Sequence, residues 1–386
     1  MALASTAFFA SFDVTDGSQE RDISPLLAKA LLYDLHLLGN MNVDFANPVY
    51  DTVYRWNEDA LNPTTATVSG SVTSIATTIT FTSAAQGGRF QEGDLIYVDS
   101  VTNTTEVMQV NNQSGDTVSV TRGFNSTAAQ SIADAVTIAI IRAEQEGSSI
   151  GSDRTVDVTV RTNSTQIFAT NDVLITGSQL ARRMATNELR DYLAHQVANR
   201  TIELKVVLSR AALYSEWIGS TSLTGSDSNY RTFGGARYWI RDAGGTVHTT
   251  SGAISWASIC TVNTTLVDNG GMPDTLVIGT DLVASVAGFD STVRRLLESD
   301  RQVGYTVTQI MLDQGNLVNV VVDARVKTGD AFLYENKNVS LKPLNGRGMF
   351  VIAATDFDDA KKRRVLGEWT MEFRQPSTAG YFRNKT

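Results

Sequence analysis

The side chains that most often carry catalysis or bind metals are few in this sequence. The three histidines, His36, His195 and His248, lie in different segments, and none stands at a metal-ligand spacing from a second His or an acidic residue. The only cysteine, Cys260, allows neither an intrachain disulfide nor a cysteine-based zinc cluster. We therefore expect structural roles for all four, with Cys260 as a small buried apolar residue.

One segment matches a nucleophile motif. Residues 147–151, GSSIG, fit the pattern G-x-S-x-G with Ser149 at its centre. That motif needs a strand before the serine and a helix after it, whereas here a strand pattern, 154–160, follows. A Walker loop, a dinucleotide-binding glycine motif and a kinase signature are all missing. We predict a protein that is not an enzyme, with no catalytic, cofactor-binding or metal-binding residues and no cofactor.

A charged cluster lies near the C-terminus. Asp356, Asp358 and Asp359 directly precede the basic run 361–364, KKRR. Charges of opposite sign in this order are typical of a solvated turn. They are also compatible with an ion pair that closes against another subunit, and both readings stay open.

Composition limits the classes of function. The 386 residues are enough for two or three domains, and the net charge of −9 argues against a protein that grips nucleic acid through phosphate contacts. The N-terminal stretch MALASTAFFASFD lacks the basic start of a signal peptide. No apolar run of about 18 residues is present, so we predict no membrane span.

The first half of the chain combines a helix with a β-rich segment. Residues 22–39 predict a helix that Asp22 or Ser24 caps and Gly39 ends, apolar on most faces, which docks on its own domain or on a neighbour. Residues 49–56 and 154–160 alternate as two pairing strands, with Tyr50, Tyr54 and Trp56 on one face in the first. Between them, residues 64–142 are rich in Ser and Thr and predict a small antiparallel barrel or sandwich. Its six strands are expected within 65–72, 77–83, 94–101, 106–110, 116–123 and 135–141.

The second half begins with a helical pattern. Residues 178–218 contain neither Gly nor Pro, and apolar residues recur at helical spacing, which predicts one long helix from Ser178 to Ile218. A helix around Trp256–Val267, a buried strand at 275–279 and a short helix that Thr280 caps and Gly288 ends should follow. Further strands are predicted at 303–312, 317–326, 331–344, 348–355 and 367–376.

The order of these elements resembles the capsid fold first known from bacteriophage Hong Kong 97. Five segments, spread along the chain outside residues 64–142, resemble the major capsid (major head) proteins of tailed bacteriophages. They are YRWNEDAL at 54–61 and the segments 162–197, 230–240, 270–290 and 365–382.

The resemblance implies an α+β Hong Kong 97-like fold with an all-β insertion in its extended loop. The implied divisions are an N-terminal arm, 1–48; an extended loop, 49–63 and 143–178; an inserted β-domain, 64–142; a peripheral domain with a long spine helix, 179–218 and 356–386; and an axial domain, 219–355. It implies pentamers and hexamers of one sequence that form an icosahedral virion shell around double-stranded DNA. The shell would be assembled in the host cytoplasm, with a portal and, in some relatives, scaffold or decoration proteins as partners.

The sequence differs from some members of this family, and two alternative functions remain open. Some relatives cross-link the shell through a lysine of the extended loop, but no Lys lies between Lys29 and Lys205, so we predict a non-covalent shell. We expect the inserted β-domain to contact neighbouring capsomers. Because Met1 is retained, we expect no removal of an N-terminal scaffold segment. The rivals are a tail or baseplate subunit of a phage and, from another class, a surface adhesin or hydrolase.

Overall fold

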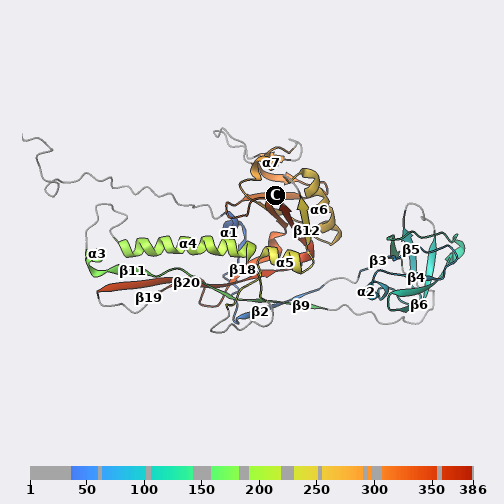
Figure 1. The fold of residues 1–386 in the computed structure, drawn as a ribbon, viewed down its shortest axis with the longest axis horizontal. Coiled ribbons are helices and arrows are strands. Elements are labelled where there is room, and N and C mark those ends of the chain that lie inside the picture. Colours follow the sequence, from blue (N-terminus) through green and yellow to red (C-terminus); the bar gives the residue numbers. More distant parts are fainter. Residues whose placement is uncertain are drawn as a thin grey trace, which may run out of the picture. The chain divides into compact units, whose positions relative to one another are not determined.

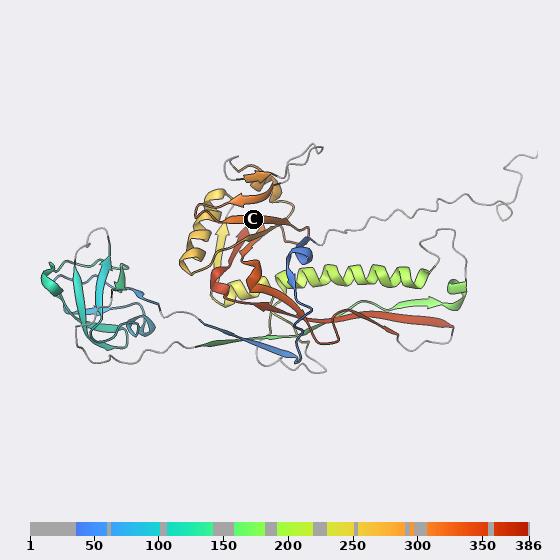
Figure 2. The same ribbon diagram turned by 180° about the vertical axis from the view of Figure 1, so that it is seen from behind.

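The computed structural model shows a mixed α+β chain with several sheets (Figures 1 and 2). The chain divides into two compact units, one made of residues 1–56 with 161–386 and the other of residues 57–160. The structure describes residues 36–59, 63–100, 106–141, 158–181, 191–218, 230–250, 254–289, 294–296, 307–353 and 359–384.

The unit 57–160 is built on one antiparallel six-stranded sheet with the order β3-β8-β5-β6-β7-β4. Its two end strands are joined beyond their ends by the bridge between Val68 and Phe81 and by the hydrogen bond from Ser69 N–H to the Thr80 carbonyl, 2.8 Å. The sheet therefore closes into a barrel, and all six predicted strands are confirmed. They are β3 (Thr65–Thr67), β4 (Thr78–Thr80), β5 (Leu95–Asp99), β6 (Val107–Ser114), β7 (Thr117–Thr121) and β8 (Thr137–Ile140).

The barrel core follows from the alternation of its strands. Every second residue points inward, so Ile79, Ile96 and Met108 are fully buried. Phe81 stacks on Phe90, with ring centroids 4.7 Å apart. A short helix, α2 (Ala84–Gly87), lies between β4 and β5, and Ser83 caps it by accepting a hydrogen bond from Gln86 N–H.

A two-stranded ribbon of β2 (Val53–Glu58) and β9 (Thr159–Ser164) precedes and follows the barrel in sequence. The two strands pair as predicted, but both lie further along the chain: the first begins four residues later than predicted, and the second, predicted at 154–160, is described at 159–164, while residues 154–157 lie outside the described residues. Asp51 accepts a hydrogen bond from Thr52 N–H at 2.6 Å, a local bend that delays the strand, and Tyr50 lies outside it, 80% exposed. Tyr54 and Trp56 do share a face and stack at 5.8 Å.

The long helical segment is shorter than the sequence predicted. A first helix, α3, covers Gly177–Ala181, and the main helix, α4, covers Tyr192–Tyr214, a length of about 34 Å. Asp191 has non-helical dihedral angles and caps α4 by accepting a hydrogen bond from Ala194 N–H, 3.0 Å. One helix from Ser178 to Ile218 was therefore wrong, because α4 starts at its own cap and residues 215–218 are not helical.

A six-stranded sheet lies against α4 (Figure 1). Its central strand is β20 (Ala360–Phe373), which pairs antiparallel with four other strands. Those are β10 (Gln166–Ala169), β11 (Val173–Thr176), β18 (Val339–Pro343) and β19 (Phe350–Ala353), while β1 (Asn42–Val43) adds to β18.

A seven-stranded mixed sheet forms the other layer of this unit, in the order β12-β21-β17-β13-β16-β15-β14. The helices α5 (Ala236–Asp242), α6 (Trp256–Asp268) and α7 (Val283–Ala287) accompany it. The strands are β12 (Thr246–Thr250), β13 (Thr275–Ile278), β14 (Arg294–Leu296), β15 (Val307–Met311), β16 (Leu317–Val322), β17 (Asp330–Tyr334) and β21 (Gly380–Asn384).

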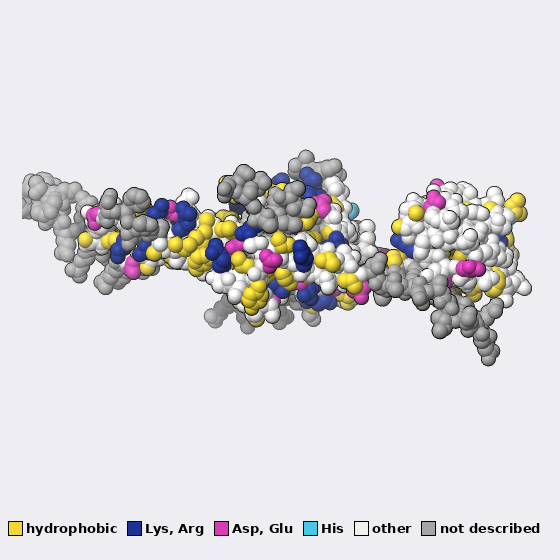
Figure 3. Space-filling model, turned by 90° about the horizontal axis from the view of Figure 1, so that it is seen from below, with side chains coloured by type: hydrophobic (Ala, Val, Ile, Leu, Met, Phe, Trp, Pro, Cys, Tyr) yellow, Lys and Arg dark blue, Asp and Glu magenta, His cyan; other side chains and the backbone are white. Residues whose placement is uncertain are grey.

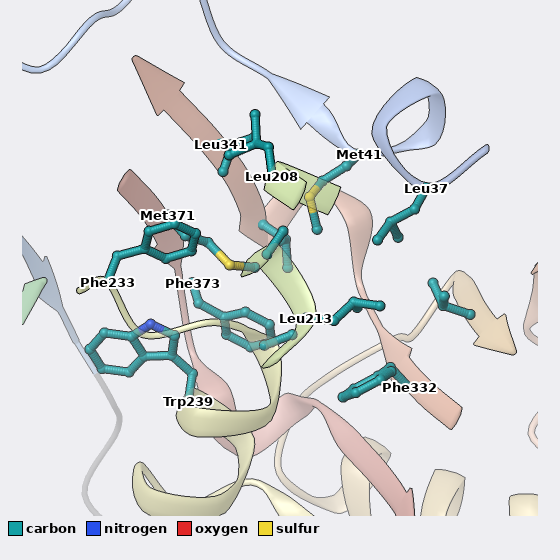
Figure 4. Close-up of a cluster of buried hydrophobic side chains, with 14 of the residues drawn as sticks. Leu37, Met41, Leu208, Leu213, Phe233, Trp239, Phe332, Leu341, Met371 and Phe373 are labelled. Atoms are coloured by element: carbon teal, nitrogen blue, oxygen red, sulfur yellow. The ribbon is translucent and has the colours of Figure 1, made fainter. Parts of the chain in front are cut away.

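The main hydrophobic core joins the two sheets to α4 and α5. Leu208 and Leu213 of α4, Trp239 of α5, Phe332 of β17 and Phe373 of β20 belong to one buried cluster (Figure 4). Burying a side chain of this size contributes about 1.5–3 kcal/mol. A second cluster lies between α6 and the seven-stranded sheet.

Several boundaries differ from the sequence predictions. The helix predicted for 22–39 is described only as α1 (His36–Asn40), which ends one residue beyond Gly39; its earlier part lies outside the described residues. Thr280 does not cap α7; the residue before that helix is Leu282, whose side chain makes no capping bond. The buried strand at 275–279, the helix near 256–267 and the stop at Gly288 are confirmed.

The strand predicted at 331–344 is two strands in different sheets. A turn at 336–338, closed by the hydrogen bond from Asn338 N–H to the Glu335 carbonyl at 3.1 Å, separates β17 from β18. The seven-stranded sheet also receives β21, whereas β18 and β19 join β20. Strand pairing therefore crosses the division expected between residues 355 and 356.

Candidate assembly surface

The residues considered for catalysis do not converge in the described part of the chain. His195 lies on α4 beside Asn199, 3.1 Å between His195 Nε2 and Asn199 Nδ2, and His248 lies on β12 against the ring of Phe382. His36 is the first residue of α1. Among the described residues, no group of three or more His, Cys, Asp or Glu side chains could hold a metal ion.

The remaining sequence candidates give no reactive group. Cys260 is half-buried on α6 rather than fully buried, and burial raises the pKa of its thiol, so the less reactive protonated form is favoured. Ser149, Asp356 and Asp358 lie outside the described residues. The described residues also contain no helix long and apolar enough to cross a membrane.

The six-stranded sheet has one face against α4 and one face turned away from it. On the first face, Val365 and Trp369 are buried in one cluster with Leu204 and Leu208 of α4. Because residues alternate between faces along a strand, β20 residues 362, 364, 366 and 368 belong to the other face.

We call this other face the outer sheet face and define it by Ile167, Leu174, Ile352, Lys362 and Arg364. Leu174 lies opposite Lys362 in the ladder, and Ile352 lies opposite Arg364. The three apolar side chains are 48%, 60% and 39% exposed, in the order given. Hydrophobic and basic side chains lie side by side on this side of the molecule (Figure 3). An apolar strip edged by charge is typical of a protein–protein contact.

The basic run of the sequence takes its partner from a different strand. Lys362 Nζ lies 2.6 Å from Asp172 Oδ2, and Arg364 binds both carboxylate oxygens of Asp172, with Nη2 3.0 Å from Oδ2. Asp172 lies between β10 and β11, so Lys362 and Arg364 connect β20 to the turn between these two strands. The contribution of Asp359 that the structure shows is a backbone one, a hydrogen bond from Gly177 N–H to its carbonyl.

A buried carboxylate fixes the ribbon strand β2 on the sheet. Glu372 of β20 accepts a hydrogen bond from Tyr54 of β2 at 2.9 Å and pairs with Lys342 of β18 at 2.8 Å and with Arg374 at 2.6 Å. Burial raises the pKa of Glu372, but the hydrogen bonds from Lys342 and Arg374 outweigh it and leave that pKa below its usual value. The ribbon is therefore anchored by a satisfied charged network.

A second buried carboxylate, Glu368, gathers three other segments. It accepts hydrogen bonds from Thr165 at 2.7 Å, from Arg231 at 2.8 Å and from Arg347 at 2.9 Å. Neither of these two charged hubs, the contacts around Glu372 and those around Glu368, was predicted from the sequence. The sequence did contain a signal for them, since Glu368 and Glu372 alternate with Trp369 and Met371 in a strand pattern. A glutamate buried in such a strand needs a cation or hydrogen-bond donors beside it.

Comparison with known proteins decides the family. A family model described as "SU10 major capsid protein" matches residues 9–386. The chain belongs to this family. No curated protein matches it.

Solved structures from three phages are similar in fold. A chain from "Cyanophage A-1(L) capsid asymmetric unit" is similar with a TM-score of 0.55 and 10% identity, over 97% of this chain and 99% of that one. A chain from Mycobacterium phage Bobi gives a TM-score of 0.51 and 11% identity, over 98% and 100%. A chain from Mycobacterium phage Adephagia has a TM-score of 0.51 and 12% identity, over 98% of this chain and 99% of that one.

Family membership confirms that this is a major capsid protein, as the resemblance implied. A major capsid protein has a structural role, which agrees with the prediction of a structural protein. The outer sheet face and the charged hubs are therefore read as parts of a shell subunit.

Proposed function

We propose that copies of this chain assemble as pentamers and hexamers into the icosahedral head of a phage, which encloses double-stranded DNA. The observation that carries the proposal is the match of a major capsid protein family to residues 9–386, nearly the whole chain. Likeness to a chain of a cyanophage capsid over 97% of its length supports it. Assembly in the host cytoplasm, a portal, and scaffold or decoration proteins belong to the same proposal.

The proposal includes a Hong Kong 97-like organisation. The arm would be residues 1–48, and the extended loop would be residues 49–63 and 143–178, with the barrel, 64–142, inserted in it. The peripheral domain would contain α4 and the sheet around β20, and the axial domain the seven-stranded sheet. Strand pairing supports this grouping, with β18 and β19 moved to the peripheral domain and β21 to the axial one.

The outer sheet face would be a contact with a second copy of the chain. Covering its apolar residues with a partner would stabilise the contact by about 25 cal/mol for each Å² of apolar surface removed from water. The charges of Arg364 and Asp172 already neutralise each other, so they do not oppose the contact. Leu174→Asp should abolish shells, because a carboxylate would be buried at the contact, while the monomer remains folded since Leu174 is 60% exposed. Leu174→Met, which keeps an apolar side chain, is the matched control and should assemble normally.

The barrel would contact neighbouring capsomers in a shell without covalent cross-links. Deletion of residues 66–140, replaced by a short turn, should give heads that disassemble at lower denaturant concentration than the full-length ones. Heads of unchanged stability would refute this role. Denaturing electrophoresis of purified heads should give a single monomer band, and a ladder of multimers would contradict the non-covalent shell.

Electron microscopy tests the proposal as a whole. The chain, expressed alone or with its neighbouring genes, should give closed shells with five-fold and six-fold capsomers. Tubes, or monomers in every expression condition, would overturn the proposal that the chain forms an icosahedral shell.

A further inference from the structure

A positively charged hollow of about 360 Å³ lies where the end of α4, α5 and the connection from β16 to β17 come together. Five residues line it: Arg210, Tyr214, Arg237, Arg325 and Lys327. Four of the five are cations, and none is acidic. Two of these cations already have a carboxylate beside them, Arg237 with Glu216 and Arg325 with Asp323, so the charge that favours entry of an anion comes mainly from Arg210 and Lys327.

The centre of the hollow is held in place by its own contacts. The phenol of Tyr214 accepts a hydrogen bond from Lys327 N–H at 2.7 Å, and the guanidinium of Arg237 lies over the Tyr214 ring, 5.4 Å from its centroid. Arg325 is buried and pairs with Asp323 at 3.1 Å. Such pre-organised donors bind an anion with little loss of side-chain freedom.

Donor capacity in the hollow remains unused. The Nε atom of Arg237 is buried and has no hydrogen-bond partner in the described part of the chain, although Nη2 of the same side chain binds Glu216 at 2.5 Å. Arg210 and Lys327 are exposed, and neither forms an ion pair with any residue that the structure describes. A buried donor without an acceptor is costly, so a carboxylate or phosphate oxygen would satisfy it.

The charge of the chain is distributed unequally between its two units. Residues 57–160 contain twelve Asp and Glu, four Arg and no Lys, a net charge of −8, whereas the rest of the chain carries −1. In a shell of many copies, acidic units and cationic hollows would both be present at high local concentration. The tip of an Asp or Glu side chain can also enter a recess to reach a buried Nε, which the broad backbone of duplex DNA fits less well.

We propose that the hollow binds a carboxylate side chain from the acidic unit 57–160 of a second copy of this chain. The inference rests on the proposed function, because it needs copies in a shell. It names the contact through which the barrel would reach its neighbour.

Carbodiimide cross-linking of assembled shells tests the contact directly, since this reagent joins an amine to a carboxylate only when the two are in contact. Lys327 supplies the only amine of the hollow. In shells assembled from a mixture of ¹⁵N-labelled and unlabelled subunits, mass spectrometry should find Lys327 joined to an Asp or Glu of residues 57–160 in mixed-label peptides. The yield should be at least about tenfold higher in shells than in dissociated subunits, because assembly raises the effective concentration of the two groups.

The control is Lys327→Arg, which keeps the charge and removes the amine. It should assemble normally and lose this cross-link alone. The double variant Arg210→Gln/Lys327→Gln should form shells that dissociate at lower salt than wild type.

The outcomes separate the two proposals. Shells in which Lys327 stays unmodified, or joins only its own copy or a segment outside 57–160, would overturn the inference and leave the capsid function intact. Duplex DNA binding that is lost in the double variant, without an inter-copy amide, would assign the hollow to phosphate and also overturn it. Failure of the wild type to form shells would overturn both.

Discussion

Asp172 binds the guanidinium of Arg364 through both of its carboxylate oxygens. The pair joins the turn between β10 and β11 to β20, and Lys362 adds a third hydrogen bond to the same carboxylate at 2.6 Å. The hydrogen bonds from Arg364 and then Lys362 lower the pKa of Asp172 to about 2. Asp172 is therefore an anion throughout the physiological range of pH.

The ion pairs of Asp172 with Arg364 and Lys362 should make the stability of the protein depend on pH, and replacement of Asp172 should remove that dependence. In the unfolded chain an Asp has a pKa of about 3.9, so the stabilisation is fully present above roughly pH 4 and is lost as pH falls towards 2. Asp172→Asn should lower the denaturation midpoint at pH 7 and have a much smaller effect near pH 2. Asp268→Asn, at an exposed site on α6 without a described ion pair, is the control and should change little at either pH. A pH-independent effect of Asp172→Asn would contradict the prediction.

The two lysines on either end of β18 should differ in their importance for stability. Lys342 is 8% exposed and pairs with buried Glu372, so Lys342→Met leaves that carboxylate short of a partner and should cost about 3 kcal/mol. Lys337 pairs with Glu335 at 2.9 Å, but its side chain is 75% exposed, and Lys337→Met should cost less than about 1 kcal/mol. Denaturant unfolding followed by tryptophan fluorescence measures both, and equal losses would show that Glu372 does not depend on Lys342.

Neighbouring positions on α4 test which side of the helix is packed. Leu208 is 2% exposed inside the main core, and Leu208→Ala should lower the free energy of unfolding by about 2–5 kcal/mol. Val207 is 49% exposed, and Val207→Ala should change it by no more than about 0.5 kcal/mol. A large loss for Val207 in the dissociated subunit would mean that α4 packs on a different face.

Consecutive glycines in the barrel give another matched pair. A Cβ on Gly87 would lie 2.3 Å from the Gly115 carbonyl oxygen, so Gly87→Ala must displace backbone and should destabilise the barrel by about 1–3 kcal/mol. At Gly88 the nearest atom is the Ala84 carbonyl oxygen at 3.3 Å, and Gly88→Ala should have a much smaller effect. All five tryptophans lie outside residues 57–160, so far-UV circular dichroism or hydrogen exchange has to follow barrel unfolding. Equal effects of the two variants would disprove the close approach.

Elements that depend on local pattern were predictable from the sequence. The six barrel strands are separated by Gly, Asn and Asp at the turns, and each strand alternates inward and outward residues, so both their number and their positions followed. The start of α4 was missed because the apolar spacing continues through Asp191, and capping by that residue depends on a backbone bend that the spacing does not encode. The strand predicted at 331–344 joined β17 to β18, although the polar residues 335–338, ENKN, lie between the two fully buried strands and are a local turn signal.

Features that join distant segments were not predictable in the same way. Asp172 meets Arg364 because β20 runs antiparallel to β10 and β11, a pairing that no local pattern specifies. The cationic hollow likewise takes its residues from two helices and a turn, more than 100 residues apart in sequence. The net charge of the whole chain gave no indication of this local basic site, because most of the negative charge belongs to residues 57–160.

The pairing of β3 with β8 places the entry and the exit of the barrel next to each other. Adjacent strands lie about 4.8 Å apart, so a foreign domain whose two ends are equally close could replace residues 65–140 without stretching the chain on either side. That makes the position a natural grafting point. An antigen or enzyme inserted there would be displayed once per subunit, at a density fixed by the shell itself.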